Sequence, residues 1–475
     1  MAACRFRTLG NWRKHSSICS VILKKPIPWV TMPGKQRFER RLPLTGMLKS
    51  SESFPGKERF KEVFILIQTN HKIIPMPIDH AAIDTVYQAL PEEIRSRVDR
   101  AIDIMVDTKK NNGRIVAVVG SGPNIHEGVT TLIAELIHKG LIDGVSTSSA
   151  VVSHEMAGAL EMVKRVYGDD LGVDADLLPV DGRLEVSLLK LDQFHAWENE
   201  ISLDMDLFRR MIGARGDVIT KVAGNMAYPT GLRTERLARD VLALARRYGL
   251  PFEQVAGLGA DPYTMIGAGA QKQVPVLVTV PQLVGGGEVG LAVGDSISIS
   301  QRCRRIADLM ESADVIIESA VALSQEIHDG PFERYTGHGI WAHWEGDRTY
   351  SLAKKKIVRI DLDPTLEKAW MHERKDGRVS GAVDRGLPKT KSIGIPFRME
   401  MSGFARIPGS LPIVGDIGEI WPILAARVSE ALGVQLDLMS YKQSTPEGED
   451  FRNWIVREVQ PLDRNRMFKA LRERP

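Results

Sequence analysis

The sequence predicts an α/β protein built on a doubly wound, mostly parallel sheet. Three observations lead to this prediction. From residue 91 onward, apolar strand patterns alternate with amphipathic helix patterns, the connections are short, and glycines and hydroxyl residues cluster where the predicted strands end. Alternating strands and helices favour a parallel sheet with helices on both faces. In such folds, ligands bind at the carboxyl ends of the strands.

Length and composition limit the class of protein. A chain of 475 residues is long enough for two or three ordinary domains, although one large α/β domain is the more economical interpretation. The net charge of +3 gives no reason to expect nucleic acid as a partner. Three cysteines cannot form a disulfide framework, which fits a reducing, cytoplasmic compartment. No apolar run is long enough to cross a bilayer, so we expect no membrane partner.

The N-terminal region differs from the rest of the chain. Residues 1–58 are predicted to form a basic, poorly ordered extension, since residues 1–29 contain many Lys and Arg and no acidic residue. This composition is typical of an organelle transit peptide. An equally good interpretation is a gene start placed too early, with Met32 or Met47 as the true beginning. A helical region is predicted for residues 59–113.

The regular region begins with a helix, indicated by an acidic first turn and by Asn-Gly at its end. The strands predicted in its first half are runs of β-branched residues. The predicted elements are helix Pro91–Gly113, strand Arg114–Gly120, helix His126–His138, strand Leu141–Ser149, helix Val151–Val166, an insertion at 169–192 with a hairpin around Asp181 and Gly182, helix Asp204–Ile212 and strand Asp217–Gly224.

The second half continues the alternation and then loses it. Its predicted elements are helix Thr234–Tyr248, a strand from Val274, helix Ser300–Glu311, strand Ala313–Ser319, helix Ala320–Ile327, a last strand within Arg348–Asp363, a loop or interface arm at 375–410 and helix Gly415–Gly433. We therefore expect the main domain at 114–372, with a C-terminal arm and helices at 373–475 packing on it.

The segment Val274–Ser296 is the first candidate site. A buried strand runs into Gly285, Gly286 and Gly287, and a second glycine-bearing turn ends at Asp295, where a helical pattern starts. Glycines let the backbone approach a ligand closely. Backbone N–H groups at a helix start favour anionic groups such as phosphates.

The loop after the first strand is the second candidate. Ser121, Gly122 and Asn124 follow the strand, and His126 comes shortly after. The segment lacks the Gly-Lys-Ser/Thr of a Walker A loop, and Ile125 stands where a GxGxxG motif has its third glycine. Two interpretations stay open: a nucleotide loop with His126 beside it, and an ordinary helix start with a solvent-facing histidine.

Hydroxyl residues end the next strand. Thr147, Ser148 and Ser149 offer donors for ribose or phosphate, and His154 follows next to Glu155. A histidine beside a carboxylate suits proton transfer. The alternative is a helix cap with a surface histidine.

Two later stretches complete the candidates. Ser319–Trp344 is rich in polar and aromatic residues and could form a metal site, an organic pocket or an interface loop. Asp361 ends a strand as a ribose-binding carboxylate would, although Asp363 beside it is also placed to cap a helix. The candidate substrate residues are Asn225, Glu326, Asp329 and Trp341.

Four of these blocks resemble the deoxyhypusine-synthase-like NAD-binding fold, in the same order and at similar spacing. They are Gly122–His126, Ser148–Glu155, Val274–Gly290 and Ile360–Lys368. One branch of the resemblance is deoxyhypusine synthase itself, and the other is the ornithine-metabolising family with a lysine-oxoglutarate reductase/saccharopine dehydrogenase homology domain. Deoxyhypusine synthase carries a lysine after its glycines, whereas Glu288 and Val289 stand here.

The resemblance implies a Rossmann-like sheet, bound NAD, a homo-oligomer (dimer or tetramer) and redox chemistry on a small cationic amine or amino acid. It implies NAD contacts from Ser121, Gly122, Asn124, Thr147, Ser148, Ser149, Gly285, Gly286, Gly287, Asp295 and Asp361. Proton transfer would fall to His126, His154 or His328. Two other classes stay open: a non-catalytic ligand-binding protein of the same fold, and a metal-dependent hydrolase using His328 and His338.

Overall fold

The structure, a computed structural model, describes residues 78–189, 191–224, 226–320, 349–396 and 399–473. The predicted N-terminal extension, 1–58, and the predicted helix Ala320–Ile327 lie almost wholly outside these ranges. Within them, no helix combines the length and the apolar character that crossing a bilayer requires.

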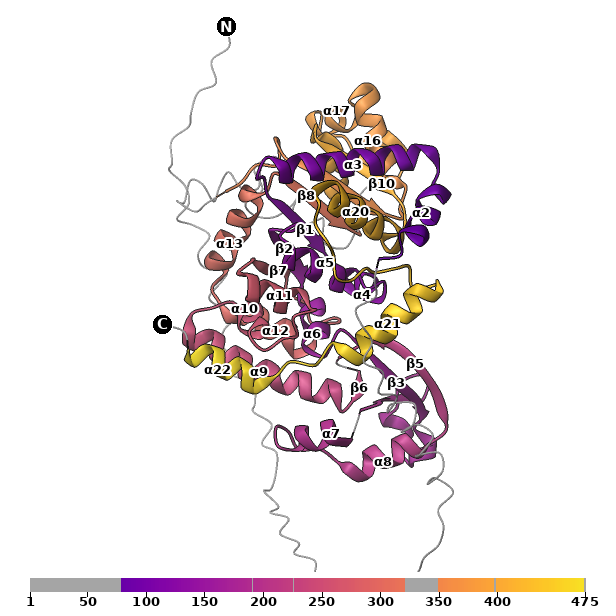
Figure 1. Ribbon diagram of the computed structural model, residues 1–475, viewed down its shortest axis with the longest axis vertical. Coiled ribbons are helices and arrows are strands. Elements are labelled where there is room, and N and C mark those ends of the chain that lie inside the picture. The colour runs from indigo at the N-terminus through magenta and orange to yellow at the C-terminus, as the bar shows by residue number, and fades with distance from the viewer. Residues whose placement is uncertain (1–77, 190, 225, 321–348, 397–398, 474–475) are drawn as a thin grey trace, which may run out of the picture. The chain divides into compact units, whose positions relative to one another are not determined.

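A six-stranded sheet forms the centre of the fold (Figure 1). Its strands are β1 (Ile115–Val119), β2 (Gly144–Ser148), β7 (Val276–Val280), β8 (Val315–Ser319), β9 (Lys356–Asp361) and β10 (Ser410–Val414). All neighbouring pairs are parallel, and the spatial order is β7-β2-β1-β8-β9-β10. Numbered along the chain within this sheet, the order is 3-2-1-4-5-6, the arrangement of the Rossmann fold. The predicted fold class is confirmed.

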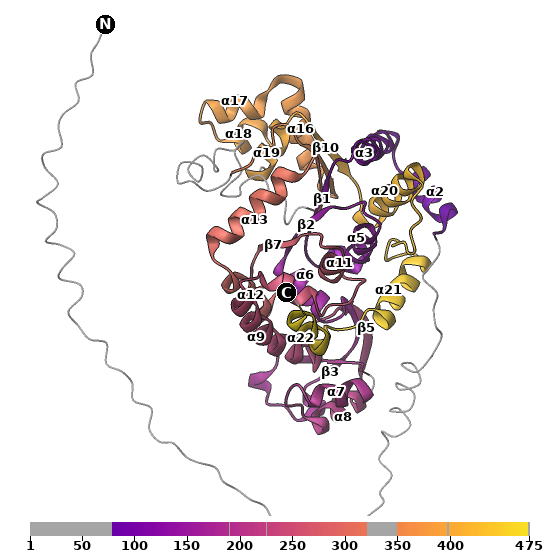
Figure 2. The same ribbon diagram turned by 60° about the vertical axis from the view of Figure 1, so that its left-hand side comes forward.

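Helices cover both faces of this sheet, which explains why a strand such as β1, with sequence IVAVV, is buried at every position. Figure 2 shows the helices on the two sides of the strands. One side has α3 (Glu92–Lys110), α5 (Val129–His138), α11 (Met265–Lys272) and α20 (Ile417–Leu432). The other side has α13 (Ile299–Ser312), α16 (Thr365–Asp376) and α19 (Met399–Arg406). Alternate residues of β1 follow this division, since Val119 packs in the core with Trp421 and Val118 in the core with Phe404.

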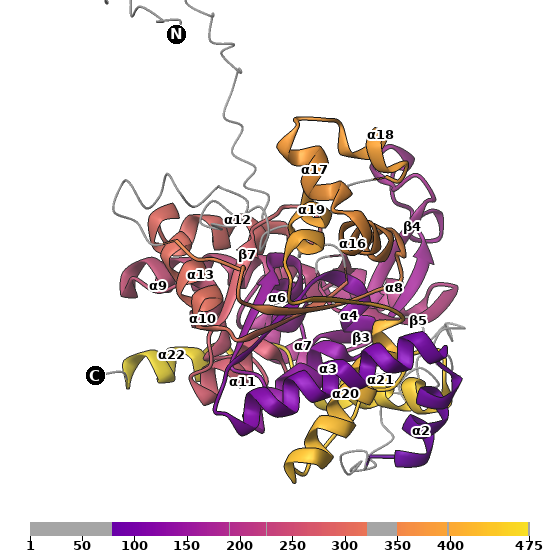
Figure 3. The same cartoon turned by 90° about the horizontal axis from the view of Figure 1, so that it is seen from above.

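Two of these helices, α3 and α20, run beside each other in Figure 3 and are in direct contact. The other helices in the described ranges include α2 (His80–Ala89), α10 (Phe252–Gly257), α12 (Gly287–Ser296), α17 (Arg378–Asp384), α18 (Lys389–Ile393), α21 (Pro446–Glu458) and α22 (Arg464–Arg472).

A second sheet is inserted between α6 (Ser149–Met156) and α9 (Thr230–Tyr248). It contains β3 (Leu160–Tyr167), β4 (Arg183–Ser187), β5 (Gly216–Val222) and β6 (Ala227–Tyr228), in the order β5-β3-β4-β6. Two helices, α7 (Leu191–Glu198) and α8 (Met205–Gly213), pack on it and give it a separate apolar core around Phe194 and Phe208 (Figure 1). The predicted small hairpin around Asp181 and Gly182 is replaced by a longer connection, residues 168–182, between the antiparallel strands β3 and β4.

The predicted helix Val151–Val166 is wrong in its second half. Helix α6 ends at Met156, and Leu160–Tyr167 is a strand. The chain turns at Gly158 (φ +102°) and Ala159 (φ +65°), backbone conformations that end a right-handed helix. The predicted strand 217–224 does form a strand, but it pairs antiparallel with β3 in the second sheet instead of joining the main sheet.

Two predicted helix starts are also wrong. The segment predicted as helix His126–His138 contains a break, because α4 (Ser121–His126) ends before α5 begins. Gly128 separates the two helices with φ +69°, and a Cβ there would lie 2.5 Å from the Phe451 ring. Helix α12 begins at Gly287, directly at the triple glycine, and the predicted second turn at Asp295 belongs to its last turn.

The sixth strand, β10, begins at the last residue of the region predicted as a loop or arm. Residues 375–410 contain α17 and α18, and β10 follows at Ser410–Val414. Pro412 conceals this strand in the sequence, because proline disfavours central strands. It is tolerated here since β10 is the edge strand of the main sheet. The sheet therefore extends beyond the predicted boundary at 372.

A buried hydrogen-bond network joins the loop after β1 to the end of β8. Asn124 Nδ2 donates to Gly120 O (2.5 Å) and to Ser319 O (3.3 Å), and the Ser319 hydroxyl donates to Asn124 Oδ1. Trp421 Nε1 on α20 donates to Ser319 Oγ (2.8 Å). All three side chains are buried. The network holds the segment after β1 against the end of β8, the two neighbouring strands between which the strand order reverses.

A second buried polar contact fixes α11 against α6. Glu155 is fully buried, and its two carboxylate oxygens accept from Met265 N (2.8 Å) and Ile266 N (3.1 Å) at the start of α11. Burial raises the pKa of Glu155 to about 7, although the two backbone hydrogen bonds lower it.

Replacing Ser319 with alanine should lower the free energy of unfolding by about 1–3 kcal/mol, because Trp421 Nε1 and Asn124 Oδ1 would each lose a buried partner. Urea unfolding measures the change. Ser300→Ala on the exposed surface is the matched control and should change stability by less than about 0.5 kcal/mol. Equal effects of the two substitutions would contradict the role given to the network.

Glu155→Gln should remove part of the pH dependence of stability. The folded-state pKa of Glu155 is raised, so its contribution is fully present below the unfolded value of 4.5 and is lost as the pH rises through about 7. Between pH 5 and pH 8 the wild type should lose about 2–3 kcal/mol more than the variant. Urea unfolding at the two pH values measures this difference. Glu92→Gln, at an exposed position, should keep the wild-type pH dependence.

Candidate functional site

The order of the main sheet reverses between β1 and β8, and ligands of open α/β sheets bind beyond the carboxyl ends of the strands at this point. The chain leaves β1 through Gly120 and enters α4 at Ser121. Gly122 is only partly buried, and a Cβ added to it would meet nothing within 4 Å. The backbone of this turn is therefore open to a ligand, whereas the Asn124 side chain is held in the buried network.

The hydroxyl groups at the end of β2 bond within the protein. Thr147 Oγ1 donates to Val119 O (2.7 Å), and Ser148 Oγ caps α6 by accepting from Val151 N (3.3 Å). Ser149 Oγ accepts from Gln282 N (2.9 Å) and donates to Gln282 O (3.2 Å). These contacts join β1, β2 and the loop after β7. A role for the three residues in ribose or phosphate binding stays a prediction.

The triple glycine gives a tight connection between β7 and α12. Gly285 is exposed with φ +76°, and Gly286 is buried. A Cβ on Gly286 would lie 2.5 Å from Gln282 O, and one on Gly290 would lie 1.8 Å from the same oxygen. Glycines are therefore required here for close packing of the helix start on the strand end, independently of any ligand.

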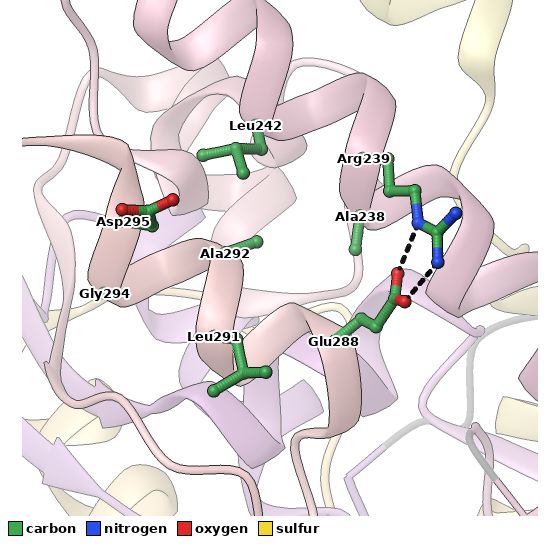
Figure 4. A pocket seen from close by; sticks show the side chains of 8 residues that line it. All are labelled: Ala238, Arg239, Leu242, Glu288, Leu291, Ala292, Gly294 and Asp295. Carbon is green, nitrogen blue, oxygen red and sulfur yellow. Dashed lines mark hydrogen bonds and ion pairs between the residues drawn. The ribbon is translucent and has the colours of Figure 1, made fainter. Parts of the chain in front are cut away.

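Asp295 lies apart from the other predicted cofactor residues. It occupies the last turn of α12, about 12 Å along the helix from Gly287. There it pairs with Arg246 and lines a surface pocket of about 560 Å³ between α9 and α12. Figure 4 shows this pocket, with Leu291 along it and the ion pair of Arg239 with Glu288 at its other end. The structure does not bring Asp295 to the strand ends.

Asp361 does lie at a strand end, and its carboxylate is already paired. Its Oδ2 accepts from Arg359 Nη2 (3.3 Å), and its Oδ1 accepts from Asp363 N (3.0 Å). Arg359 is fully buried, with Glu318 Oε2 3.8 Å from its Nε. Asp363 Oδ1 in turn accepts from the N–H of Thr365 (2.9 Å), the first residue of α16, although the N-cap residue of this helix is Pro364 and not Asp363.

The fold brings two of the predicted catalytic histidines into one cluster. His126 is the last residue of α4 and His154 lies in α6, and these helices follow the carboxyl ends of β1 and β2 and pack on each other. Helix α4 also contacts β5 of the second sheet, which carries Lys221. Arg452, on α21, is close enough to act electrostatically on His126. We refer to His126, His154, Lys221 and Arg452 as the histidine cluster.

Both histidines of the cluster are held in the neutral form. Burial lowers the pKa of His126, and the positive charges of Arg452 and Lys221 lower it further. Burial lowers the pKa of His154 to about 4, with smaller contributions from Lys221 and His126, against a hydrogen bond to Ala223 O that raises it. A neutral imidazole is a proton acceptor. The cluster therefore combines proton acceptors with two cations that favour an anionic group.

The two cations are held in place by neighbouring groups. Lys221 Nζ donates to Glu185 Oε2 (2.6 Å) across the second sheet, and Arg452 Nη2 donates to Thr220 O (3.0 Å) on β5. Neither Lys221 nor Arg452 is among the site residues predicted from the sequence. Arg452 lies far along the chain from both histidines, and the packing of α21 against β3 and against Gly128 brings it here.

The carboxylate next to His154 in sequence is not its partner, because Glu155 accepts from the start of α11. Other predicted residues, His328, Asn225, Glu326, Asp329 and Trp341, lie outside the described residues. Within the described ranges, no group of three or more His, Cys, Asp or Glu side chains is arranged to hold a metal ion.

No protein-family model matches the chain. An ornithine cyclodeaminase from Methanothermobacter thermautotrophicus is 38% identical over 72 residues, which cover 15% of this chain and 16% of that protein. The match thus spans only a small part of either protein.

Two solved structures are among the matches, both at low sequence identity. A LOR/SDH protein from Methanococcus maripaludis S2 matches at 13% identity and a TM-score of 0.33, over 83% of this chain and 77% of that one. AgrE, solved with ornithine and NAD+, matches at 12% identity and a TM-score of 0.34, over 75% of this chain and 34% of that one. Both branches of the predicted resemblance stay predictions.

Proposed function

We propose that the chain is an NAD-dependent enzyme that acts on an amine or amino acid at the carbon bearing the nitrogen or oxygen. The observation that carries the proposal is the position of the histidine cluster, next to the point where a 3-2-1-4-5-6 sheet reverses its order. The local similarity to an ornithine cyclodeaminase supports an amino-acid substrate.

The residues at the strand ends fit a dinucleotide. The open backbone at Gly122 suits close approach of a pyrophosphate, because an added Cβ there would meet nothing within 4 Å. Rossmann folds also use a carboxylate at a strand end for the ribose, and Asp361 is the carboxylate so placed here. Bound NAD would supply a hydride acceptor for the substrate carbon.

The histidine cluster supplies the acid–base and binding groups. Neutral His154 and His126 would accept the proton released from the substrate nitrogen or oxygen. Lys221 and Arg452 would bind the carboxylate of an amino acid, because both are cations close enough to act electrostatically on His126. Candidate groups for the amino end of the substrate are Glu326, Asp329, Trp341 and Asn225.

Gly122→Ala should weaken NAD binding by at least about tenfold and leave the fold intact. The added methyl group meets nothing in the protein, so stability should change by no more than about 1 kcal/mol. It would instead occupy space that the pyrophosphate approaches. Calorimetric titration with NAD measures the affinity.

Gly213→Ala is the matched control for this substitution. Gly213 also has nothing within 4 Å of an added Cβ, and it lies at the end of α8 beside the second sheet. This variant should bind NAD as the wild type does. Wild-type affinity in Gly122→Ala would exclude the turn after β1 as the pyrophosphate site, and absence of NAD binding by the wild type would overturn the proposed function.

His154→Gln and His126→Gln should each lower turnover by about a hundredfold or more and leave NAD affinity nearly unchanged, because general acid–base groups act on the reaction and not on cofactor binding. Turnover is followed by mass spectrometry of ornithine, lysine and arginine incubated with enzyme and NAD. His195→Gln, an exposed histidine on α7 paired with Glu198, is the control and should retain wild-type turnover. Full turnover in both cluster variants would remove the histidines from the mechanism.

A further inference from the structure

One peptide group lies between His154 and a buried carboxylate of the second sheet. The carbonyl oxygen of Ala223 is hydrogen bonded to His154 Nδ1. The N–H of Gly224 donates to Glu161 Oε1 (3.1 Å). The carbonyl of residue 223 and the N–H of residue 224 belong to the same planar amide. His154, this amide and Glu161 therefore form one continuous chain of hydrogen bonds, which we call the peptide relay.

The relay determines which ring nitrogen of His154 carries the proton. A carbonyl oxygen only accepts hydrogen bonds, so Nδ1 of His154 must be the donor. In the neutral ring the lone pair then lies on Nε2. The nitrogen that is left to accept a proton is the one on the far side of the ring from Ala223.

The backbone at Gly224 is shaped for this contact. Its φ of +134° is a conformation that side-chain-bearing residues rarely adopt. A Cβ there would also lie 3.2 Å from His154 Nδ1. Glu161 is buried at the start of β3, in register with Lys221 of β5. The relay is therefore built from a buried histidine, a glycine turn and a buried carboxylate that belong to three separate elements.

We propose that Glu161 is a positioning residue for His154, acting through the 223–224 peptide. An ionised Glu161 attracts the Gly224 N–H and draws electron density toward the Ala223 oxygen, which strengthens the hydrogen bond from Nδ1–H. This fixes the tautomer and the orientation of the ring and makes Nε2 a better proton acceptor, as a carboxylate does when it contacts a histidine directly. The catalytic meaning of the relay rests on the proposed function, although its existence does not.

The charge of the relay depends on pH. Burial raises the pKa of Glu161 to about 7, opposed by hydrogen bonds from neighbouring donors and by the charge of Lys221. His154 stays neutral above about pH 4. A negative charge therefore develops on Glu161 as the pH rises through about 7, while His154 does not titrate. Other titratable or charged groups near the relay are His126 on α4, Glu155 on α6, Glu185 on β4, Lys221 on β5 and Arg452 on α21.

The test is a ¹⁵N NMR titration of the full chain labelled with [¹⁵N]histidine, without NAD or substrate. His154→Gln assigns the signals. In the wild type, the ring nitrogens of His154 should shift with a midpoint near pH 7. In Glu161→Gln this shift should vanish between pH 6 and pH 8, because glutamine keeps an oxygen that accepts from Gly224 N but carries no charge. A His154 signal that titrates identically in both proteins would overturn the proposal.

Two controls separate the relay from its neighbours. Glu155→Gln and His126→Gln remove the adjacent groups that titrate, and the shift of His154 should persist in both. If the pH-dependent shift of His154 disappears in Glu155→Gln or in His126→Gln and remains in Glu161→Gln, the proposed role of Glu161 is wrong. Should Glu161→Gln not fold, the wild type still decides: the Gly224 amide, labelled with [¹⁵N]glycine, must titrate with the same midpoint as His154, and different midpoints overturn the proposal.

Discussion

The hydrogen bonds among Asn124, Ser319 and Trp421 are the constraint on which the rest of the site depends. They hold the start of α4, which follows β1 directly, against the end of β8, the place where the sheet reverses its order. Helix α4 also carries His126, so the same hydrogen bonds help to place this histidine. A buried polar network of this kind fixes one arrangement of the backbone, because each unsatisfied member would cost free energy.

Residues from the main sheet and from the inserted sheet together form the histidine cluster. The main sheet supplies the two histidines through α4 and α6, and the inserted sheet supplies Lys221 and the peptide that holds His154. Neither sheet alone contains both the proton acceptors and the cations. The inserted sheet therefore contributes functional groups to the candidate site, namely a cation and a hydrogen-bonding peptide.

Much of the fold could be predicted from the sequence, since runs such as Ile115–Val119 are apolar and β-branched and alternate with amphipathic helices. The errors have physical causes. Strand β3 was predicted as helix because Glu161 and its neighbours have good helix propensity, and pairing with β4 and β5 overrides it. Two histidines of the site were predicted from strand-end position. Lys221 and Arg452 were not, because a single sequence does not show which distant segments meet.

The contact between Gly128 and Phe451 has a consequence for how the protein matures. Helix α21 lies against this glycine, and Arg452 is the next residue along that helix. During synthesis, both histidines leave the ribosome long before α21 does. All six strands of the main sheet precede α21 in the chain, so they leave the ribosome before Arg452, whose charge helps to lower the pKa of His126. A nascent chain would thus contain every strand of the main sheet before it contains the second cation of the histidine cluster.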